Sequence, residues 1–593
     1  MHPSSKLRSA GVALVSIVVC LIAVSGAGAG VVPTLTTTFT QDTVEPTGTS
    51  GATTIVTTDD NKLGSHADFT ADIDFNYGPS GATGSGGTVK SLVIDTPPGL
   101  VGNPNAIPYE DRCDVSVFET GSCPASATVG TFQIDVTLFP DDHGGGLDLA
   151  TLGGHAGLTR VSLLKTDPEV PAQIGIYVKS LSNYAIVRTK LSIAPLTDQG
   201  LRLRTITLGD LPNTIERLDE PDNYALQIRH MRLKLWGKLP NGRNFMTNPL
   251  SCETWHSQIW ANTWENNDNP NADPFGVGTN THIAGAPTTS DPDCSNAASV
   301  PFPISGGVAI STPDRNTSPA FDFTVDNPGV QGDGQVSSTP KKIVTTVPAS
   351  INVDVAQVGR TCPVGDFMAD NCPLTSKVGS VKIDTPLIRA GLSGNVYLVK
   401  RDPKAGLPDL GLYVTGAITF VQLGSNQYVG PNFNQIETTF DNIPQVGFTK
   451  LTFHLDGGPN GLLRSLKCPT YNKSPAVPNF TYNFTSWTGA SATSTTPLNM
   501  ANCFGIQTLK SYPRCLSKKL PVHPNYQSRA RVKSVSLKIN GKQRAKTKKS
   551  PFRFDLKINK LKLKKGKKYK LELKAVYDDG TVSAKTVNFK TCK

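Results

Sequence analysis

Carboxylates that recur in two halves of this 593-residue sequence are its first candidates for chemistry. Asp135 and Asp384 are the last residues of two stretches of similar sequence, 129–135 and 378–384. Asp167 and Asp402 each precede a proline. A glycosidase needs two such carboxyl groups at a set separation. Asp-Pro is also ordinary turn chemistry, and Asp135 ends an alternating pattern that points its side chain to water. We therefore expect no catalysis from these carboxylates.

Catalytic signatures are also missing from the sequence. It contains no G-x-S-x-G, H-E-x-x-H, P-loop or dinucleotide-binding pattern. Its nine histidines do not recur between the two halves, since His230 aligns with Lys450 and His454 with Lys234. A catalytic triad shared by both halves is thereby excluded, although a site in one half alone is not. We predict no catalytic residue, metal or cofactor, and we favour a protein that is not an enzyme.

One stretch places tryptophans beside acidic and amide side chains. Its candidate glycan-binding residues are Trp255, Trp260, Trp264, Glu265 and Asp268. Aromatic rings stack on sugars, and an oxygen-rich loop can hold calcium. The alternative is three core tryptophans next to a solvated loop. The later half has aromatic residues at the corresponding place, which favours packing, and the spacing lacks the glycine-centred twelve-residue loop of an EF-hand.

The first 29 residues have the layout of a secretory signal peptide. Lys6 and Arg8 precede an apolar run from Val12 to Val24, and small residues follow as far as Ala29. A run of thirteen residues is too short for a transmembrane helix, which needs about twenty. The sequence therefore predicts an extracellular protein, released or retained at the cell envelope, without a transmembrane segment.

Ten cysteines follow the signal peptide, an even number that suits disulfides in an oxidising compartment. No C-x-x-C occurs, which argues against zinc ribbons and thioredoxin-type redox sites. A pairing that works in both halves is the simplest one. The predicted disulfides are Cys113–Cys123, Cys252–Cys294, Cys362–Cys372, Cys468–Cys503 and Cys515–Cys592.

The two halves are diverged copies of one module. After each closely spaced cysteine pair comes a gap-free match, Val-Gly-Thr-Phe-Gln-Ile-Asp at 129–135 and Val-Gly-Ser-Val-Lys-Ile-Asp at 378–384. Gly-Ile-Tyr-Val at 175–178 and Gly-Leu-Tyr-Val at 411–414 follow in the same order. These matches predict a Thr/Gly/Ser-rich stalk over 30–62, a first module over 63–308 and a second over 316–508.

Residues 511–593 form a strongly basic third domain. They contain 25 Lys and Arg against four acids, a net charge of +21, while the whole chain is +11 and residues 1–510 therefore sum to −10. The candidate anion-binding residues are Lys562, Lys564, Lys565, Lys567, Lys568 and Lys570. Outward strand positions must be polar in any case. That requirement explains why lysines alternate with apolar residues, but it does not explain the excess of basic over acidic residues. The electrostatic field of a domain with this net positive charge attracts anionic polymers. The few aromatic residues of the domain argue against specific nucleic-acid recognition.

Alternating apolar residues and abundant turn formers predict an all-β protein. We expect two disulfide-braced, β-sandwich-like modules, followed by a small immunoglobulin-like β-sandwich. The cysteine pair followed by Val-Gly, together with Ser-Trp-Thr-Gly-Ala-Ser-Ala at 486–492, resembles a family of secreted repeat proteins of soil actinobacteria. The first module departs from this pattern after Cys252. The resemblance implies export and a repeat architecture, and it implies no functional residue.

These features favour a non-enzymatic extracellular or cell-surface structural or adhesive binding protein. Its basic domain would dock on anionic polymers of the cell envelope. The alternative is a carbohydrate-binding or carbohydrate-active protein that uses the tryptophan-rich loop of the first module to bind polysaccharide.

Overall fold

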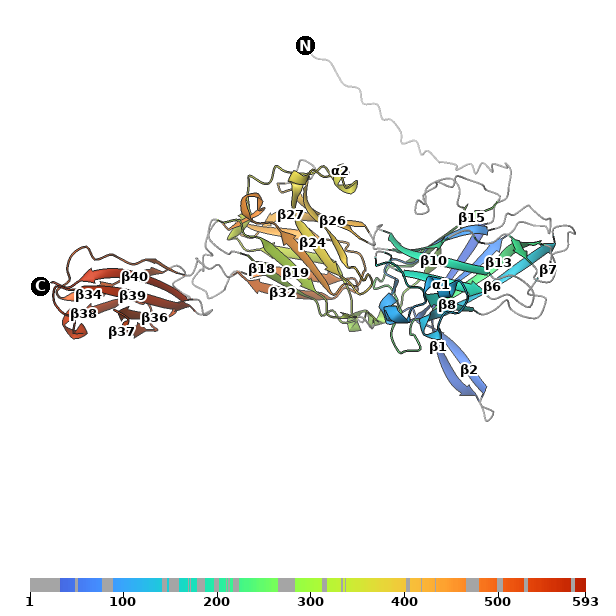
Figure 1. Cartoon of the computed structure of the whole chain (residues 1–593), viewed down its shortest axis with the longest axis horizontal. Coiled ribbons are helices and arrows are strands. Elements are labelled where there is room, and N and C mark those ends of the chain that lie inside the picture. Colours follow the sequence, from blue (N-terminus) through green and yellow to red (C-terminus); the bar gives the residue numbers. More distant parts are fainter. Residues whose placement is uncertain are drawn as a thin grey trace, which may run out of the picture.

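The computed structural model of the chain is built almost entirely of β-strands. Three units follow one another along its long axis, the first two large and the third small (Figure 1). No helix among the described residues is long and apolar enough to cross a membrane. Described residues run from 32 to 592, with gaps at 48–51, 77–88, 141–146, 149–158, 169, 171, 179–186, 197–201, 209–210, 212–213, 217–222, 265–282, 312–316, 332–333, 336, 401–405, 417–418, 432–433, 466–478, 499–504, 527–531 and 578–581. The predicted signal peptide lies outside them.

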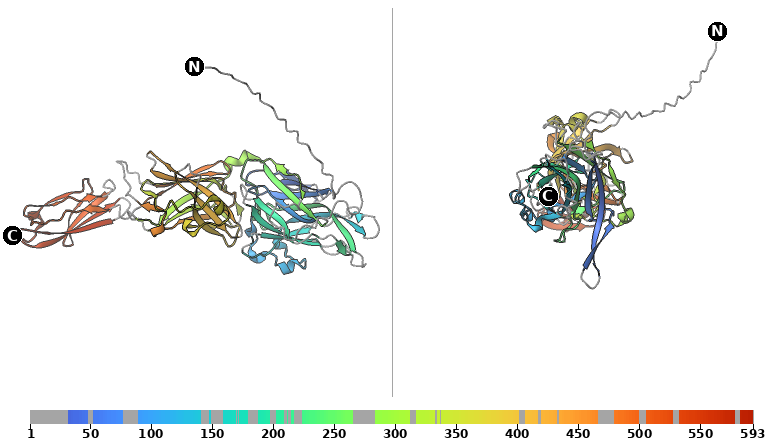
Figure 2. Two further views of the ribbon diagram at one scale, coloured as in Figure 1. Left: turned by 90° about the horizontal axis from the view of Figure 1, so that it is seen from above. Right: turned by 90° about the vertical axis from the view of Figure 1, so that its right-hand side faces the viewer.

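The first module is one antiparallel sheet. Its strands, in spatial order, are β1 (Val32–Thr47), β3 (Asp68–Asn76), β13 (Asn223–Leu235), β6 (Thr128–Pro140), β8 (Thr159–Leu163), β9 (Ala172–Val178), β10 (Val187–Leu196), β11 (Arg202–Leu208), β4 (Val89–Asp95) and β15 (Trp255–Thr263). The short strands β16 (Ile283–Ala284) and β17 (Thr288–Ser290) pair with β15 at the far edge. At the opposite edge of the sheet, β1 also pairs with β2 (Ala52–Asp59), and the two strands form a hairpin that projects from the module (Figures 1 and 2).

The second module repeats this arrangement strand for strand. Its spatial order is β18 (Ser305–Ile310), β19 (Phe321–Asp326), β29 (Lys450–Leu455), β24 (Lys377–Asp384), β25 (Leu392–Val399), β26 (Asp409–Thr415), β27 (Phe420–Val429), β28 (Gln435–Phe440), β22 (Pro340–Val347), β31 (Asn479–Ser486) and β32 (Ser491–Pro497). A two-stranded ladder recurs too, as β5 (Val101–Gly102) with β14 (Met246–Thr247) and as β23 (Ile351–Val353) with β30 (Leu463–Ser465). The same pairing order in both sheets agrees with a duplication.

Each sheet rolls until its two edges meet. In the first module a bridge joins Thr34 of β1 to Ala286, just before β17. In the second, the Tyr482 hydroxyl of β31 donates to the carbonyl of Gly307 in β18 at 2.7 Å, and Ser494 of β32 donates to Gly306 at 2.9 Å. Rolling gives each module one continuous core, built from inward residues of the strands whose side chains the structure describes. It also covers the edge strands that would otherwise be open to pairing.

Four of the five predicted disulfides are present: Cys113–Cys123, Cys252–Cys294, Cys362–Cys372 and Cys515–Cys592. Cys468 and Cys503 lie outside the described residues. The two ten-residue loops attach in the same way, because the main chain of Cys113 pairs with Leu164 and that of Cys362 with Val399. The repeated spacing therefore produces a repeated structure.

Each ten-residue disulfide loop buries one phenylalanine on the outside of the sheet. Phe118 and Phe367 are almost fully buried and pack edge-to-face on Tyr177 and Tyr413. A Cβ at Gly411 would lie 2.6 Å from the Phe367 ring, and one at Gly175 would lie 2.5 Å from the Phe118 ring. The glycine of the repeated Gly-Xaa-Tyr-Val stretch thus makes room for the phenylalanine.

The third unit is a small sandwich around one core. A four-stranded sheet, β37 (Lys542–Thr547), β36 (Val532–Ile539), β39 (Lys568–Tyr577) and β40 (Val582–Lys590), packs with two short ladders. These ladders pair β34 (Lys519–Val522) with β38 (Phe554–Lys557), and β33 (Ile506–Thr508) with β35 (Asn525–Tyr526). Asn540-Gly541 forms the hairpin turn between β36 and β37, with both residues at positive φ, as this dipeptide favours.

The structure corrects three predicted boundaries. Residues 32–47 are a strand of the first sheet and not a loose stalk, because Leu35 and Phe39 alternate inward and are buried. Residues 305–308 belong to the second module, since β18 pairs with β19. Residues 506–508 belong to the third unit, since Ile506 is in its core. Thr-rich composition concealed the first strand, although β-branched threonine favours strands.

The packing of Phe367 on Gly411 leads to a testable prediction. We expect Gly411→Ala to destabilise the second module by about 1–3 kcal/mol, because the new methyl group overpacks a ring that the disulfide loop holds in place. Hydrogen exchange of the β24–β26 peptides, measured by mass spectrometry, would report this. Gly359→Ala is the control, since nothing lies within 4 Å of a Cβ there. Equal protection in both variants would contradict the packing role.

Candidate functional site

The tryptophans of the first module lie in different environments. Trp255 is only 1% exposed, packs edge-to-face on Phe39, and donates its Nε1–H to the carbonyl of Ser251. It is a core residue and is not accessible to a glycan, so its place among the candidate glycan-binding residues is corrected. Trp260 and Trp264 are half-buried. Glu265 and Asp268 lie outside the described residues.

Trp264 has a structural counterpart in the second module. Its Nε1–H donates to the carbonyl of Leu211 at 2.9 Å, and the ammonium group of Lys90 lies 5.0 Å from its ring centre. In the same way, the Nε1–H of Trp487 donates to the carbonyl of Ile443 at 2.9 Å, and the ammonium group of Lys341 lies 4.7 Å from the ring centre of Trp487. Each tryptophan thus fastens the end of one strand to a neighbouring loop, and a lysine covers its ring.

Sequence comparison placed aromatic residues, Trp487 among them, at the corresponding place, but it did not match Trp487 with Trp264, because the two tryptophans lie at different distances from the preceding cysteine. Trp264 follows Cys252 by twelve residues, and Trp487 follows Cys468 by nineteen. Alignment of the strands β15 and β31, in place of the cysteines, would have found it. A contact repeated in both modules is explained by packing and does not call for a sugar.

The recurrent carboxylates are not brought together as a catalytic pair. Asp135 on β6 contacts Nδ1 of His230 at 3.3 Å, and the other ring nitrogen of His230 bonds Asp72 on β3. Asp384 on β24 pairs with Lys382 at 2.9 Å. Asp167 is exposed in a loop, and Asp402 lies outside the described residues. Within the described part of the chain, no group of three or more His, Cys, Asp or Glu side chains is placed to hold a metal ion.

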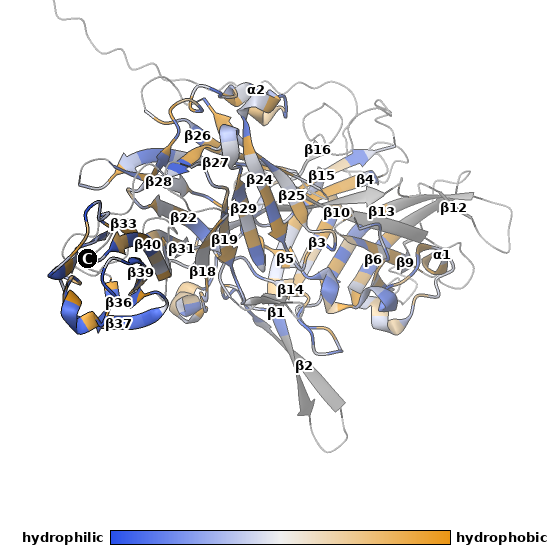
Figure 3. Cartoon of the chain, turned by 60° about the vertical axis from the view of Figure 1, so that its left-hand side comes forward, coloured by the Kyte–Doolittle hydropathy of each residue, from blue (hydrophilic) through white to orange (hydrophobic). Residues whose placement is uncertain are grey.

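The six candidate anion-binding lysines gather at one end of the third unit, and we call them the lysine tip. All six, Lys562, Lys564, Lys565, Lys567, Lys568 and Lys570, are exposed. None of them forms an ion pair with a described carboxylate. Hydrophilic and hydrophobic residues alternate along the strands of this domain (Figure 3), and the hydrophobic ones form its core.

The main chain of the lysine tip is held firmly. The Lys564 N–H donates to the Tyr569 hydroxyl at 2.6 Å, and Thr591 donates its hydroxyl to the Lys564 carbonyl at 2.7 Å. The Gly566 N–H donates to the carbonyl of Cys592, which the terminal disulfide anchors. Because the backbone groups are satisfied within the fold, the charged side chains are displayed from a fixed loop.

Lysines in this domain also stand directly opposite one another across strands. Lys568 pairs with Lys590 between β39 and β40, and Lys519 pairs with Lys557 between β34 and β38. Like charges in directly opposed positions destabilise a sheet. Fold stability therefore does not account for this arrangement.

The two modules meet in a polar joint. Gln445 from the loop after β28 is 2% exposed, and its Oε1 accepts the N–H of Leu250 from the first module at 2.8 Å. Asn105 donates to the carbonyl of Pro386 across the same joint. The guanidinium of Arg389 lies 3.8 Å from the ring centre of Tyr109.

A buried arginine organises the first-module side of the joint. Arg112 donates to the carbonyls of Ile107 and Pro104, and it lies 5.5 Å from the ring centre of Tyr109. Burial lowers the pKa of its guanidinium, and repulsion from Arg389 adds to the effect. Tyr109 therefore contacts arginines from both modules, and sequence reasoning did not identify any of these joint residues.

Comparison with known proteins gives no family for this chain. No protein-family model and no curated protein matches it. Solved structures that match include fibronectin(III)-like modules of CbhA from Clostridium thermocellum, with 9% identity, 48% of this chain and 94% of that chain covered, and a TM-score of 0.14. Others are the FN1–FN3 domains of chicken CNTN1 (9% identity, 74% and 98% covered, TM-score 0.14) and a tetra-tandem repeat from the extending region of a large adhesion protein (12%, 73% and 98%, TM-score 0.17). With TM-scores this low, the all-β class rests on the chain's own sheets.

The joint generates the second prediction. We expect Gln445→Ala to raise the hydrogen-exchange rate of the peptide containing Leu250 by about tenfold or more, because the substitution leaves a buried N–H without its acceptor, a loss of about 1–3 kcal/mol. Gln427→Ala is the matched control, since that side chain is exposed and bonds Glu437 within its own module. If the Leu250 peptide exchanges no faster in Gln445→Ala than in the control, Gln445 does not hold the joint.

Proposed function

We propose that this chain is an extracellular binding protein that is not an enzyme and that docks on anionic polymers of the cell envelope through its C-terminal domain. The observation that carries the proposal is the lysine tip, six exposed lysines without described carboxylate partners on a loop fixed by Tyr569 and Thr591. The charge is concentrated in this domain, at +21 for residues 511–593 against −10 for the remainder. Polymers with regularly spaced phosphate or carboxylate groups, such as wall teichoic acids and polyuronates, fit this pattern.

The rest of the chain supports an extracellular structural or adhesive role. Four disulfides brace the three units, and disulfides persist in oxidising compartments. The two rolled modules are joined through Gln445, and the basic domain lies at one end of the molecule (Figure 2). Such a pair would present its outer surfaces at a distance from the envelope.

The lysine tip gives the third prediction. We expect a variant with Lys564, Lys565, Lys567 and Lys568 all changed to Gln to bind purified actinobacterial envelopes at least tenfold more weakly at 0.1 M salt, because each lysine near an anionic surface contributes about 1 kcal/mol. Binding of the unchanged chain should itself fall steeply with added salt. Co-sedimentation across a salt series measures both effects.

A charge-matched control tests location against net charge. In it, Lys533, Lys546, Lys548 and Lys549 are changed to Gln, which removes four exposed charges away from the tip. This control should keep most of the affinity. Equal weakening in both variants would show that net charge and not the tip is responsible, and salt-independent binding would contradict electrostatic docking altogether.

A further inference from the structure

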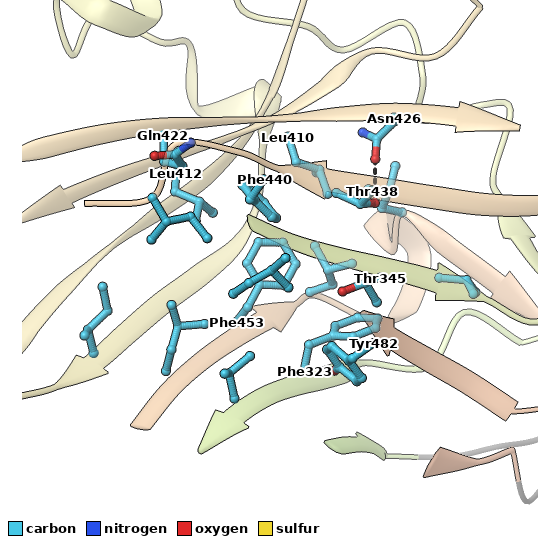
Figure 4. Close-up of a pocket in the computed structure, with 18 of the residues that line it drawn as sticks. Phe323, Thr345, Leu410, Leu412, Gln422, Asn426, Thr438, Phe440, Phe453 and Tyr482 are labelled. Carbon is cyan, nitrogen blue, oxygen red and sulfur yellow. Dashed lines mark hydrogen bonds between the residues drawn. The ribbon is translucent and has the colours of Figure 1, made fainter. Parts of the chain in front are cut away.

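The rolled sheet of the second module encloses an apolar cavity. Its volume is about 140 Å³, and its walls come from strands on both sides of the roll (Figure 4). Leu410, Leu412, Phe440 and Phe453 are among the lining side chains, and among the described residues no Asp, Glu, Lys, Arg or His lines the cavity. Cavities of about this size that are lined by aliphatic and aromatic groups stay dry and bind small apolar guests.

The few polar groups in the wall are nearly all satisfied by the protein itself. Asn426 accepts from Thr438 at 2.6 Å and donates to the carbonyl of Pro408 at 2.7 Å, and Gln422 donates to the carbonyl of Asp441 at 2.8 Å. Thr385 donates to Gly447 at 2.6 Å. These groups are engaged already, so the wall recognises an occupant by apolar contact rather than through hydrogen bonds.

The phenol of Tyr482 adds no charge to the wall. Its hydroxyl donates to Gly307, and burial raises its pKa, so the group stays neutral. A charged occupant would find no counter-ion among the described lining residues and would lose its hydration there. The part of any ligand that enters must therefore be uncharged hydrocarbon.

The cavity extends along the strands. On β27 its lining residues run from Phe420 through Gln422 to Asn426, all on one face of the strand. Six residues of β-strand span roughly 20 Å. A modest volume distributed over that length is narrow, which suits one extended alkyl chain better than a fused ring system.

One end of the cavity offers an entrance. Phe420, Phe440, Ile443, Val446 and Leu451 line the cavity and are only half-buried. They come from the start of β27, the end of β28, the following loop and the start of β29, which lie at the same end of the sheet. This is the end that faces the first module, where Gln445 enters the joint.

From these observations we propose that the second module binds a single-chain lipid, with its hydrocarbon chain inside the rolled sheet and its polar head at the end that faces the first module. The occupant is recognised by chain length and not by charge. This site is separate from the lysine tip, so the proposal stands independently of docking on the envelope.

The test is displacement of the fluorescent fatty acid cis-parinaric acid from the full chain without its signal peptide, using butyrate, hexanoate, octanoate, decanoate and palmitate as competitors, so that the series includes chains too short to fill the cavity. Affinity should rise by about fourfold for each added methylene, which corresponds to about 0.8 kcal/mol, until the cavity is filled. The charge-reduced lysine-tip variant should give the same series. Failure of cis-parinaric acid to bind, or an affinity that does not depend on chain length, would overturn the proposal.

Two substitutions on adjacent residues of β22 locate the site. Thr345 points into the cavity and has no hydrogen-bond partner among the described residues, so Thr345→Phe fills space without breaking a bond (Figure 4). Thr346 points to the opposite face, toward Glu437, and Thr346→Phe is the matched control. Thr345→Phe should weaken palmitate binding at least tenfold, and Thr346→Phe should leave it unchanged. Equal effects would overturn the location, and the chain-length series remains decisive if either variant fails to fold.

Discussion

A sheet whose two edges meet is the constraint on which both modules depend. In the second module this closure is fastened by the hydrogen bond from the Tyr482 hydroxyl to the carbonyl of Gly307. Within both sheets, neighbouring main chains also pack closely. At Gly130 and Gly379 an added Cβ would overlap a carbonyl oxygen of the adjacent strand, which explains why the Val-Gly dipeptide recurs. The roll directs apolar side chains to a shared interior and leaves the disulfide loops outside. The continuous core of each module follows from that closure.

Charge is separated from the rolled sheets rather than spread over the chain. A lysine-rich surface on a module would add repulsion to a sheet that already needs close main-chain contact. The small third unit tolerates opposed lysines such as Lys568 and Lys590, because a disulfide near its two ends and a single core hold it together. The rolled modules and the excess of positive charge thus lie in different parts of the molecule.

Much of this architecture could be predicted from repeated residues, and the limits of prediction have physical causes. Cysteine spacing and the Val-Gly and Gly-Xaa-Tyr-Val stretches are local, so they survive divergence and mark equivalent strands. The strand β1 escaped prediction because threonine-rich composition outweighed the alternation of Leu35 and Phe39. The equivalence of Trp264 and Trp487 depends on strand pairing, which loop-length differences hide. The number of lysines can be counted in the sequence. The position of the lysine tip, in contrast, depends on how the chain folds around Tyr569.

Neither the cavity nor the joint has a sequence signature, and they share one loop. Ile443 and Val446 line the cavity, while Gln445 between them enters the first module and accepts the Leu250 N–H. A short loop cannot move one of these side chains without moving the others, so displacement of the cavity wall also strains a buried hydrogen bond. The space inside the second module is therefore set partly by its neighbour. The volume left empty in a core depends on the distance between its walls. The periodicity of apolar residues in the sequence does not determine that distance.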